Sequence, residues 1–281
     1  MSKPILLDGA SGTGLWEIAE RNGVAKDPVW KYNVEHPDFV AELAKGYIDA
    51  GSEIILANTF SANGPSVKRS SAYSVEEIVV PAVEIAKSQT AGTNVKVNLN
   101  IGPLTMLLEP YGDLTEEEAE EIFTEIIAPG IRAGADGVTI ETFMDIEMMK
   151  IAARVACSYD VPVLCSMSFE QVGKTMFGNS VEDVIEGLSE FPVAGIGMNC
   201  SVGPESAIPI IKEFAEKTDI PVIAKPNAGL PIMSDDGSVS IAYTAEQFAA
   251  DMKEVVPYVG YLGACCGSNA SYIRELKKLL G

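Results

Sequence analysis

The sequence has little positive charge. Its 281 residues include 20 Lys and Arg against 40 Asp and Glu, which gives a formal net charge of −20 at pH 7. Nucleic acids and anionic membranes favour cationic protein surfaces, so neither is expected as a partner. The simplest role of the acidic surface is solubility, and a sharper one is docking of a basic partner protein.

Several other signals are missing. No apolar run approaches the roughly 20 residues that a membrane span requires, and no secretory signal is visible, so we expect a cytoplasmic protein. His36 is the only histidine, and the turn at Gly9–Gly14 lacks the GxGxxG spacing of a dinucleotide-binding loop. Five cysteines, an odd count, suit a reducing compartment and free thiols.

Short apolar runs alternate with amphipathic helical segments along the chain. Eight runs predict buried parallel strands, at Ile5–Asp8, Glu53–Phe60, Val95–Ile101, Gly137–Phe143, Pro162–Phe169, Gly195–Cys200, Pro221–Pro226 and Gly260–Cys266. Helices are predicted after them, at Asp38–Ala50, Ser74–Gln89, Thr115–Ala133, Asp145–Ser158, Ser180–Glu190, Pro204–Thr218, Thr244–Val256 and Ser268–Leu280. Thr115 is a candidate N-cap before a Glu-rich first turn.

Eight strand–helix units over this length predict an α/β fold, a single (β/α)8 TIM barrel spanning residues 1–281. No linker or low-complexity stretch divides the chain, and Asn227–Gly237 is predicted to be a long loop after the seventh strand. In such barrels the chemistry lies in the loops at the C-terminal ends of the strands. A functional site is therefore expected at those positions.

Three cysteines stand at predicted strand ends. Cys200 closes the sixth strand, and Cys265 and Cys266 close the eighth. Only the seventh strand separates these two in a closed barrel, so the three sulfurs can meet at its mouth. Three thiolates and an open fourth position suit a catalytic Zn²⁺ that activates a thiol in preference to water. A chance pairing or a vicinal disulfide is the alternative, and Cys157 and Cys165 are expected to be core residues.

Polar residues also stand at predicted strand ends. Glu141, in the fourth strand, could receive a substrate ammonium group or accept hydrogen bonds from loop amides. Asp8 precedes a turn beginning at Gly9, whose N–H groups could hold a carboxylate or simply form a tight turn. Asn58 and Asn199 could orient sulfur or substrate, or could cap their own strand ends.

Lys225 ends the seventh predicted strand. A lone lysine at such a position is also what a Schiff-base lyase uses, so a lyase is a second functional hypothesis. Nothing nearby in the sequence indicates that burial or a second cation activates this amine.

Together these motifs resemble the homocysteine S-methyltransferase family, and above all the homocysteine-binding barrel of cobalamin-dependent methionine synthase. The similarity runs essentially end to end. Its elements are Leu7-Asp8-Gly9-Ala10-Ser11-Gly12-Thr13, Glu35-His36-Pro37, Asn58-Thr59-Phe60, Gly102-Pro103, Glu141-Thr142, Asn199-Cys200 and Gly263-Ala264-Cys265-Cys266-Gly267. The Asn-Cys pair combined with Gly-x-Cys-Cys-Gly is highly specific.

The resemblance implies a role for each strand-end residue. The residues that match the zinc ligands of the family are Cys200, Cys265 and Cys266. Asp8 and Gly9 match the loop that holds the amino-acid part of homocysteine, Glu141 matches the carboxylate on its amino group, and Asn199 would support the metal site. The implied reaction is attack of a zinc-bound thiolate on an activated methyl group. Ser11 stands where Met is usual, which leaves another small thiol open as the acceptor.

The methyl donor implied by the resemblance is a corrinoid (cobalamin) on a separate protein, because no folate-binding barrel or cobalamin domain accompanies this barrel. A small donor such as S-methylmethionine, S-adenosylmethionine or a betaine is the alternative within the same class. A third hypothesis is a non-catalytic zinc-binding subunit of a methyltransferase complex, although the candidate substrate residues Asp8 and Glu141 argue against it.

Overall fold

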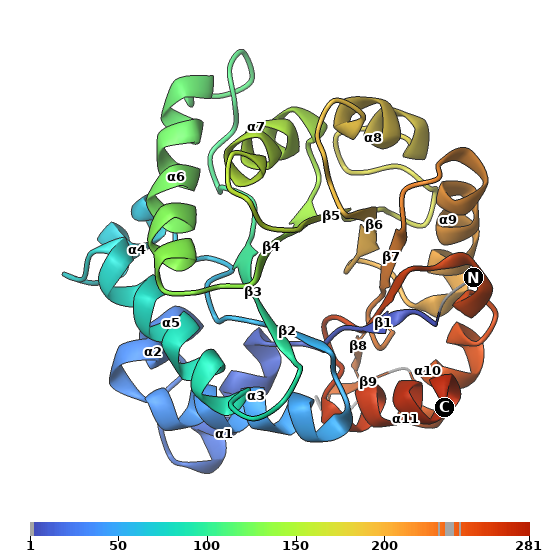
Figure 1. Ribbon diagram of the computed structural model, residues 1–281, viewed down its shortest axis with the longest axis horizontal. Helices are drawn as coiled ribbons and strands as arrows, with labels where there is room; N and C mark the ends of the chain where they lie inside the picture. Colours follow the sequence, from blue (N-terminus) through green and yellow to red (C-terminus); the bar gives the residue numbers. More distant parts are fainter. Residues whose placement is uncertain (1–2, 230, 234–238, 242) are drawn as a thin grey trace.

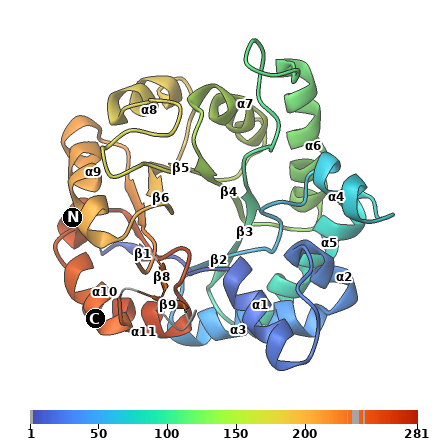
Figure 2. The same cartoon turned by 180° about the vertical axis from the view of Figure 1, so that it is seen from behind.

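The protein is described by a computed structural model that covers residues 3–229, 231–233, 239–241 and 243–281. Eight parallel strands form one sheet in the order β1-β10-β7-β6-β5-β4-β3-β2, and helices surround it as an outer ring (Figure 1). The same ring is seen from behind (Figure 2). The predicted (β/α)8 barrel is confirmed.

The elements follow one another in an almost regular alternation. The barrel strands are β1 (Ile5–Leu6), β2 (Ile54–Leu56), β3 (Lys96–Ile101), β4 (Gly137–Phe143), β5 (Val163–Met167), β6 (Gly195–Asn199), β7 (Val222–Lys225) and β10 (Tyr261–Leu262). The helices are α1 (Gly12–Arg21), α2 (Tyr32–Glu35), α3 (Pro37–Ala50), α4 (Gly64–Ser70), α5 (Val75–Gln89), α6 (Glu116–Arg132), α7 (Ile146–Cys157), α8 (Val181–Leu188), α9 (Pro204–Lys217), α10 (Ala245–Met252) and α11 (Ala270–Leu280). A separate antiparallel hairpin consists of β8 (Pro231–Met233) and β9 (Val239–Ile241).

The strands of the sheet bury apolar side chains on both faces, toward the barrel interior and toward the helices. Every residue of β5 and β6 is buried. At the seam, β1 pairs with β10 through Ile5 opposite Tyr261. On the other side, the Glu53 N–H donates to the Leu6 carbonyl at 2.7 Å, which links β1 to the start of β2. The barrel is thus nearly closed.

Capping residues define where the outer helices begin. Thr115 caps α6 as predicted: its hydroxyl accepts from the Glu118 N–H at 3.2 Å, and the Glu118 carboxylate accepts from the Thr115 N–H at 3.1 Å. Ser74 and Glu77 make the same reciprocal pair at α5. Each such cap contributes roughly 1 kcal/mol of helix stability.

Some strands are shorter than predicted at their C-terminal ends. The second strand ends at Leu56 and the eighth at Leu262, where Phe60 and Cys266 were expected. The physical reason is that the residues after these strands leave the sheet and form the loops at the barrel mouth. Asp8 and Asn58 therefore lie in loops, whereas Glu141, Asn199 and Lys225 lie within their strands.

Several further elements were not predicted, among them α1, α2, α4 and the hairpin of β8 and β9. Helix α1 is hidden in the sequence by Gly12 and Gly14, yet Leu15 and Ile18 give it a buried face. Strand β8 falls in the stretch predicted as the loop Asn227–Gly237, so that prediction is wrong there. Residues 230 and 234–237 of this stretch lie outside the described part of the chain.

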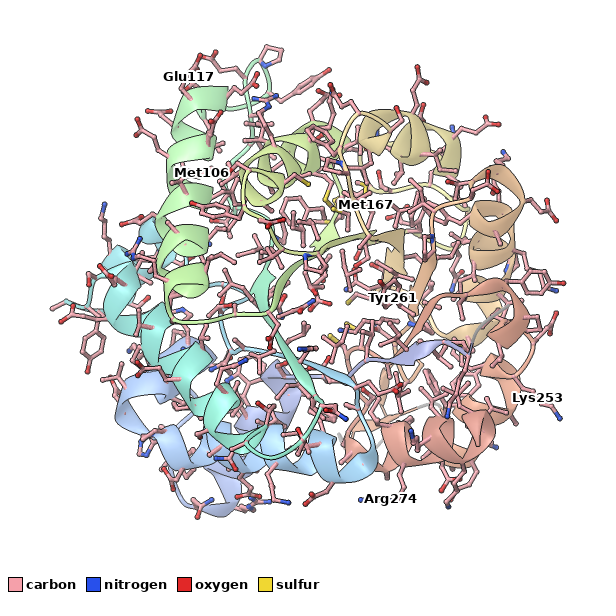
Figure 3. All side chains as sticks on the ribbon, in the orientation of Figure 1. Met106, Glu117, Met167, Lys253, Tyr261 and Arg274 are labelled. Carbon is pink, nitrogen blue, oxygen red and sulfur yellow. The ribbon has the colours of Figure 1, made fainter. Side chains whose placement is uncertain are left out.

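Charged side chains cover the outside of the ring of helices. Met167 and Tyr261 lie inside the ring, whereas Lys253 and Arg274 project from its outer surface (Figure 3). Within the residues that the structure describes, no helix combines the length and apolarity that crossing a bilayer would require.

Candidate functional site

The three strand-end cysteines meet at one end of the barrel. Cys200 directly follows β6, while Cys265 and Cys266 follow β10, and β7 is the strand between these two. The three sulfur atoms all lie within 4.8 Å of one another, and the Sγ atoms of Cys200 and Cys266 are 3.7 Å apart. The structure therefore brings together the residues that the topology argument had placed at the mouth.

The spacing of the sulfurs fits a zinc ion. Zinc–sulfur bonds of about 2.3 Å in a tetrahedral site place two sulfurs roughly 3.8 Å apart. The Cys200–Cys266 separation of 3.7 Å agrees with that value, and all three cysteines are free thiols. Cys266 is exposed while Cys200 and Cys265 are partly buried, so the cluster faces the solvent on one side.

Without a metal, the pKa values of these thiols are raised. The hydrogen bond with Cys265 lowers the pKa of Cys200, but the one with Cys266 and burial raise it to about 11. For Cys266, the hydrogen bond with Cys200 lowers the pKa, and the one with Cys265 and burial raise it to about 12. Three thiols crowded in this way resist ionisation, and a bound dication offsets that by deprotonating its ligands.

The other two cysteines lie elsewhere. Cys165 is fully buried in β5, where burial raises its pKa well above the ordinary value. Cys157 ends α7 in a surface hollow lined by Pro162 and Pro192, at the N-terminal end of the strands. Cys165 is a core residue as expected, whereas Cys157 is only partly buried at the edge of the core.

The backbone around the cysteine cluster is strained. Cys200 and Ser201 adopt φ values of 63° and 58°, and Thr142, beside them in β4, has φ 69°. A β-branched residue such as Thr142 rarely adopts this left-handed conformation. Each such residue costs roughly 1–3 kcal/mol, and strain of this kind gathers at functional sites.

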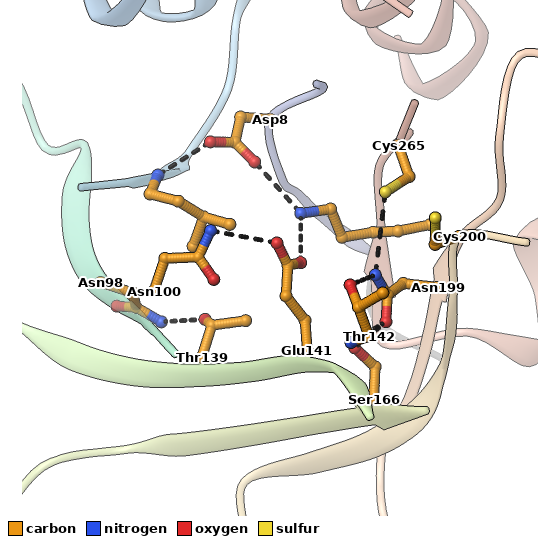
Figure 4. Close-up of polar contacts among 12 residues, drawn as sticks. Asp8, Asn98, Asn100, Thr139, Glu141, Thr142, Ser166, Asn199, Cys200 and Cys265 are labelled. Carbon is orange, nitrogen blue, oxygen red and sulfur yellow. Dashed lines mark hydrogen bonds and ion pairs between the residues drawn. The ribbon is translucent and has the colours of Figure 1, made fainter. Parts of the chain in front are cut away.

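Asn199 connects three strands to the cluster (Figure 4). Its Nδ2 donates to the Thr142 hydroxyl at 2.7 Å and lies 3.7 Å from the Cys265 sulfur. Its Oδ1 accepts from the Thr142 N–H at 2.7 Å and from the Ser166 hydroxyl at 2.9 Å. Because Asn199 is completely buried, these bonds hold its amide in one orientation toward the sulfur.

A buried ion cluster lies beside the cysteines. The Lys225 ammonium is 3.0 Å from the Glu141 carboxylate and 3.3 Å from the Asp8 carboxylate, and each of these residues is at least nine-tenths buried (Figure 4). The other Asp8 oxygen accepts from the Leu56 N–H at 2.8 Å, and the other Glu141 oxygen accepts from Asn100 Nδ2 at 3.1 Å. Three predicted strand-end residues thus form one hydrogen-bonded unit.

This cluster contradicts the lyase hypothesis. Burial alone lowers the pKa of Lys225, but the charges of Glu141 and Asp8 outweigh it and raise that pKa well above its ordinary value. A Schiff-base nucleophile has to be a neutral amine, and Lys225 is held as an ammonium. Burial is also the main reason why the pKa of Asp8 is raised, against the lowering effect of Lys225.

The loop after Asp8 is tightly packed. A side chain on Gly9 would place a Cβ 2.7 Å from the Ser268 hydroxyl and 2.9 Å from the Tyr47 hydroxyl, so only glycine fits. The Ala10 N–H donates to Ser268 Oγ at 3.1 Å, and the Ala10 carbonyl accepts from Tyr47 Oη at 2.7 Å. These contacts favour the tight-turn interpretation for Ala10, and substrate binding at Gly9 stays a prediction.

The side chain of Asn58 forms hydrogen bonds with other residues of the protein. Its Nδ2 donates to the Val29 carbonyl and to Asn33 Oδ1, both at 2.8 Å. Asn33 in turn donates to the Asn58 carbonyl at 2.9 Å. This pairing favours a structural role, and substrate binding by Asn58 stays a prediction.

Sequence reasoning missed the contribution of Asn100. Its Nδ2 bonds Glu141, while its buried Oδ1 has no hydrogen-bond partner within the described residues. The available signal was that Asn98 and Asn100 recur with a two-residue period in an otherwise apolar strand, which places both on one face. The partnership of Lys225 with the two carboxylates was missed as well.

Comparison with known proteins decides the family. A model of the homocysteine S-methyltransferase family matches residues 5–280. The chain belongs to this family. The predicted family and the predicted enzyme class, a methyltransferase, are confirmed.

Two relatives are methionine synthases. This chain is 24% identical over 261 residues to the methionine synthase of Mycobacterium leprae, and the alignment covers 87% of this chain and 21% of that protein. It is 24% identical over 258 residues to that of Mycobacterium tuberculosis, covering 87% of this chain and 22% of the relative. The chain therefore spans about a fifth of the length of these relatives.

Solved structures show the same fold. The metallated form of the homocysteine methyltransferase MmuM from Escherichia coli superposes with a TM-score of 0.80 at 21% identity, covering 99% of this chain and 96% of that one. Its oxidized form gives the same TM-score at 20% identity. At this level of identity the likeness establishes the barrel fold.

Proposed function

We propose that this domain transfers a methyl group to homocysteine or a similar small thiol, with Zn²⁺ held by Cys200, Cys265 and Cys266. The observation that carries the proposal is the convergence of three sulfurs within 4.8 Å at the barrel mouth of a chain from this family. When bound, zinc lowers the pKa of a thiol ligand and keeps it nucleophilic at neutral pH.

The surrounding residues would serve this chemistry. Asn199 would hold Cys265 through the amide that lies 3.7 Å from its sulfur. Asp8, Gly9 and Glu141 would face the part of the acceptor beyond its sulfur, beside the same mouth. The exposed side of the cluster at Cys266 would admit the methyl donor.

We propose that this donor is a methyl-corrinoid carried by a protein. The support is the resemblance of the chain to the homocysteine-binding barrel of cobalamin-dependent methionine synthase, together with relatives named methionine synthase. A cytoplasmic location belongs to the same proposal, because all five cysteines are free thiols.

The test is a donor screen with the zinc-loaded protein. Methyl transfer to homocysteine would be measured from a purified methyl-corrinoid protein and, separately, from S-methylmethionine, S-adenosylmethionine and a betaine. We expect turnover with the corrinoid protein. Turnover with a small donor only would disprove the proposed donor. Stoichiometric zinc without any thiol binding would instead favour a non-catalytic zinc-binding subunit.

A further inference from the structure

A cation of the protein already occupies the position that the resemblance assigns to the substrate's amino group. Lys225 Nζ lies between the two candidate substrate carboxylates, 3.3 Å from Asp8 and 3.0 Å from Glu141. The lysine side chain is 2% exposed, so this ammonium is shielded from solvent at the centre of the site.

The oxygens of the two carboxylates already accept hydrogen bonds from the protein. Lys225 bonds one oxygen of each, the Leu56 N–H bonds the second oxygen of Asp8, and Asn100 bonds the second oxygen of Glu141. Every one of the four oxygens thus has a donor from the protein. A second ammonium would have to share these oxygens with Lys225 at close range.

The residue after β10 packs closely against Lys225. Gly263 follows β10, and a Cβ at this position would lie 3.2 Å from Lys225 Cγ and 2.8 Å from the Asp8 carbonyl. Glycine is required here by the Asp8 carbonyl and by Leu7 Cβ at 2.9 Å, and it also leaves room for the stem of Lys225. Lys225 itself pairs in register with Asn199, so its Cα is fixed by the barrel.

We propose that Lys225 replaces the substrate ammonium, and that the preferred acceptor is a small thiol without an amino group. This inference rests on the proposed function, because it specifies the acceptor at the same site. An acceptor of this kind leaves the Asp8–Lys225–Glu141 cluster intact. An amino-acid thiol would bring two like charges together in a desolvated pocket, which is strongly disfavoured.

A matched pair of thiols tests the proposal. Homocysteine and 4-mercaptobutyrate share the same chain and differ only in the amino group. Isothermal titration of the zinc-loaded protein should show tighter binding of 4-mercaptobutyrate, by about tenfold or more. In Lys225→Met the preference should reverse, because the ammonium of homocysteine then supplies the missing charge. Lys212→Met, which removes a surface partner of Glu254, is the matched control and should keep the wild-type ratio.

The ratio of the two thiol affinities in the wild-type protein tests the inference even if Lys225→Met does not fold. Equal or tighter binding of homocysteine by the wild-type protein would overturn the inference, and so would failure of both thiols to bind. If 4-mercaptobutyrate binds more tightly but neither thiol is methylated by any donor, the binding preference for a thiol without an amino group stands and the proposed methyl transfer fails.

Discussion

Each end of the barrel carries an aspartate paired with lysine, and the two pairs differ in burial. At the mouth, Asp8 and Lys225 are both 2% exposed. At the opposite end, Asp136 accepts from the Val97 N–H at 2.8 Å and from Lys87 at 2.9 Å, with side-chain exposures of 22% for Asp136 and 36% for Lys87. The residue types are the same, but only the mouth pair lies beside the cysteine cluster.

The pKa values of the two aspartates are shifted in opposite directions. Burial raises the pKa of Asp8 despite the charge of Lys225. Burial also acts to raise the pKa of Asp136, but hydrogen bonds from the Val97 N–H and Lys87 outweigh it and hold that pKa below its ordinary value. The lowered pKa means that ionised Asp136 stabilises the fold, as is typical of that end of such barrels, whereas Asp8 lies at the end where barrels carry their active sites.

The largest expected difference between the two ends concerns metal binding. Cys200→Ala at the mouth should abolish zinc retention and methyl transfer, because two thiolates cannot replace three. The loss of affinity should exceed the roughly 10–100-fold caused by removing an outer-shell partner. Metal analysis after gel filtration, with circular dichroism to confirm folding, measures this. Cys157→Ala, near the base, is the control. Stoichiometric zinc in Cys200→Ala would refute the three-thiolate site.

Removing the lysine of each pair should lower the free energy of unfolding by very different amounts. Lys225→Met leaves two buried carboxylates unpaired and should cost about 3–5 kcal/mol of unfolding free energy. Lys87→Met at the exposed pair should cost at most about 1 kcal/mol. Urea unfolding of both variants measures the contrast.

The loss of unfolding free energy in Lys225→Met, here called the deficit, should also depend on pH. A carboxyl group whose folded-state pKa is raised, as that of Asp8 is, destabilises the fold once it ionises. The deficit should therefore be complete above the raised folded-state pKa of Asp8 and shrink as the pH falls through it, because the folded state then takes up the proton. A deficit that grows on acidification would contradict this account.

A smaller effect is expected from the amide that faces the sulfurs. Asn199→Ala removes the donor near Cys265 and the bonds to Thr142 and Ser166. Zinc affinity should fall by about 10–100-fold, measured by competition with a chelator. Ser168→Ala, which removes a bond to the Asn199 carbonyl only, should change zinc affinity much less. Equal losses in the two variants would argue against an orienting role for the Asn199 amide.

The smallest expected effect is at the base. Asp136→Asn should lower stability by about 1 kcal/mol at neutral pH and leave zinc content and thiol binding unchanged. Because the folded-state pKa of Asp136 is lowered, this contribution is present above the ordinary pKa and disappears as the pH falls through the lowered value. The free energy of unfolding, measured from pH 7 down to acidic pH, tests this contribution. A change in zinc content would contradict the view that Asp136 does not affect the cysteine cluster.

The sequence predicted the barrel and the cysteine cluster because both depend on regular local patterns. Strand and helix periodicities are local, and eight such units imply that strand ends meet at one face. It did not predict the Asp8–Lys225–Glu141 unit, whose partners are 217 and 84 residues apart. It also missed α1, because its glycines obscured the helical pattern.

The sequence by itself determined the fold class, the family motifs and which cysteines stand at strand ends. Only the tertiary structure decided the charge arrangement between them. The protonation and pairing of Lys225 depend on burial and on carboxylates from distant strands, and no local pattern encodes either. The same lysine that suggested a Schiff base in the sequence is, in the folded barrel, a buried ammonium paired with Asp8 and Glu141, because these two carboxylates hold its proton.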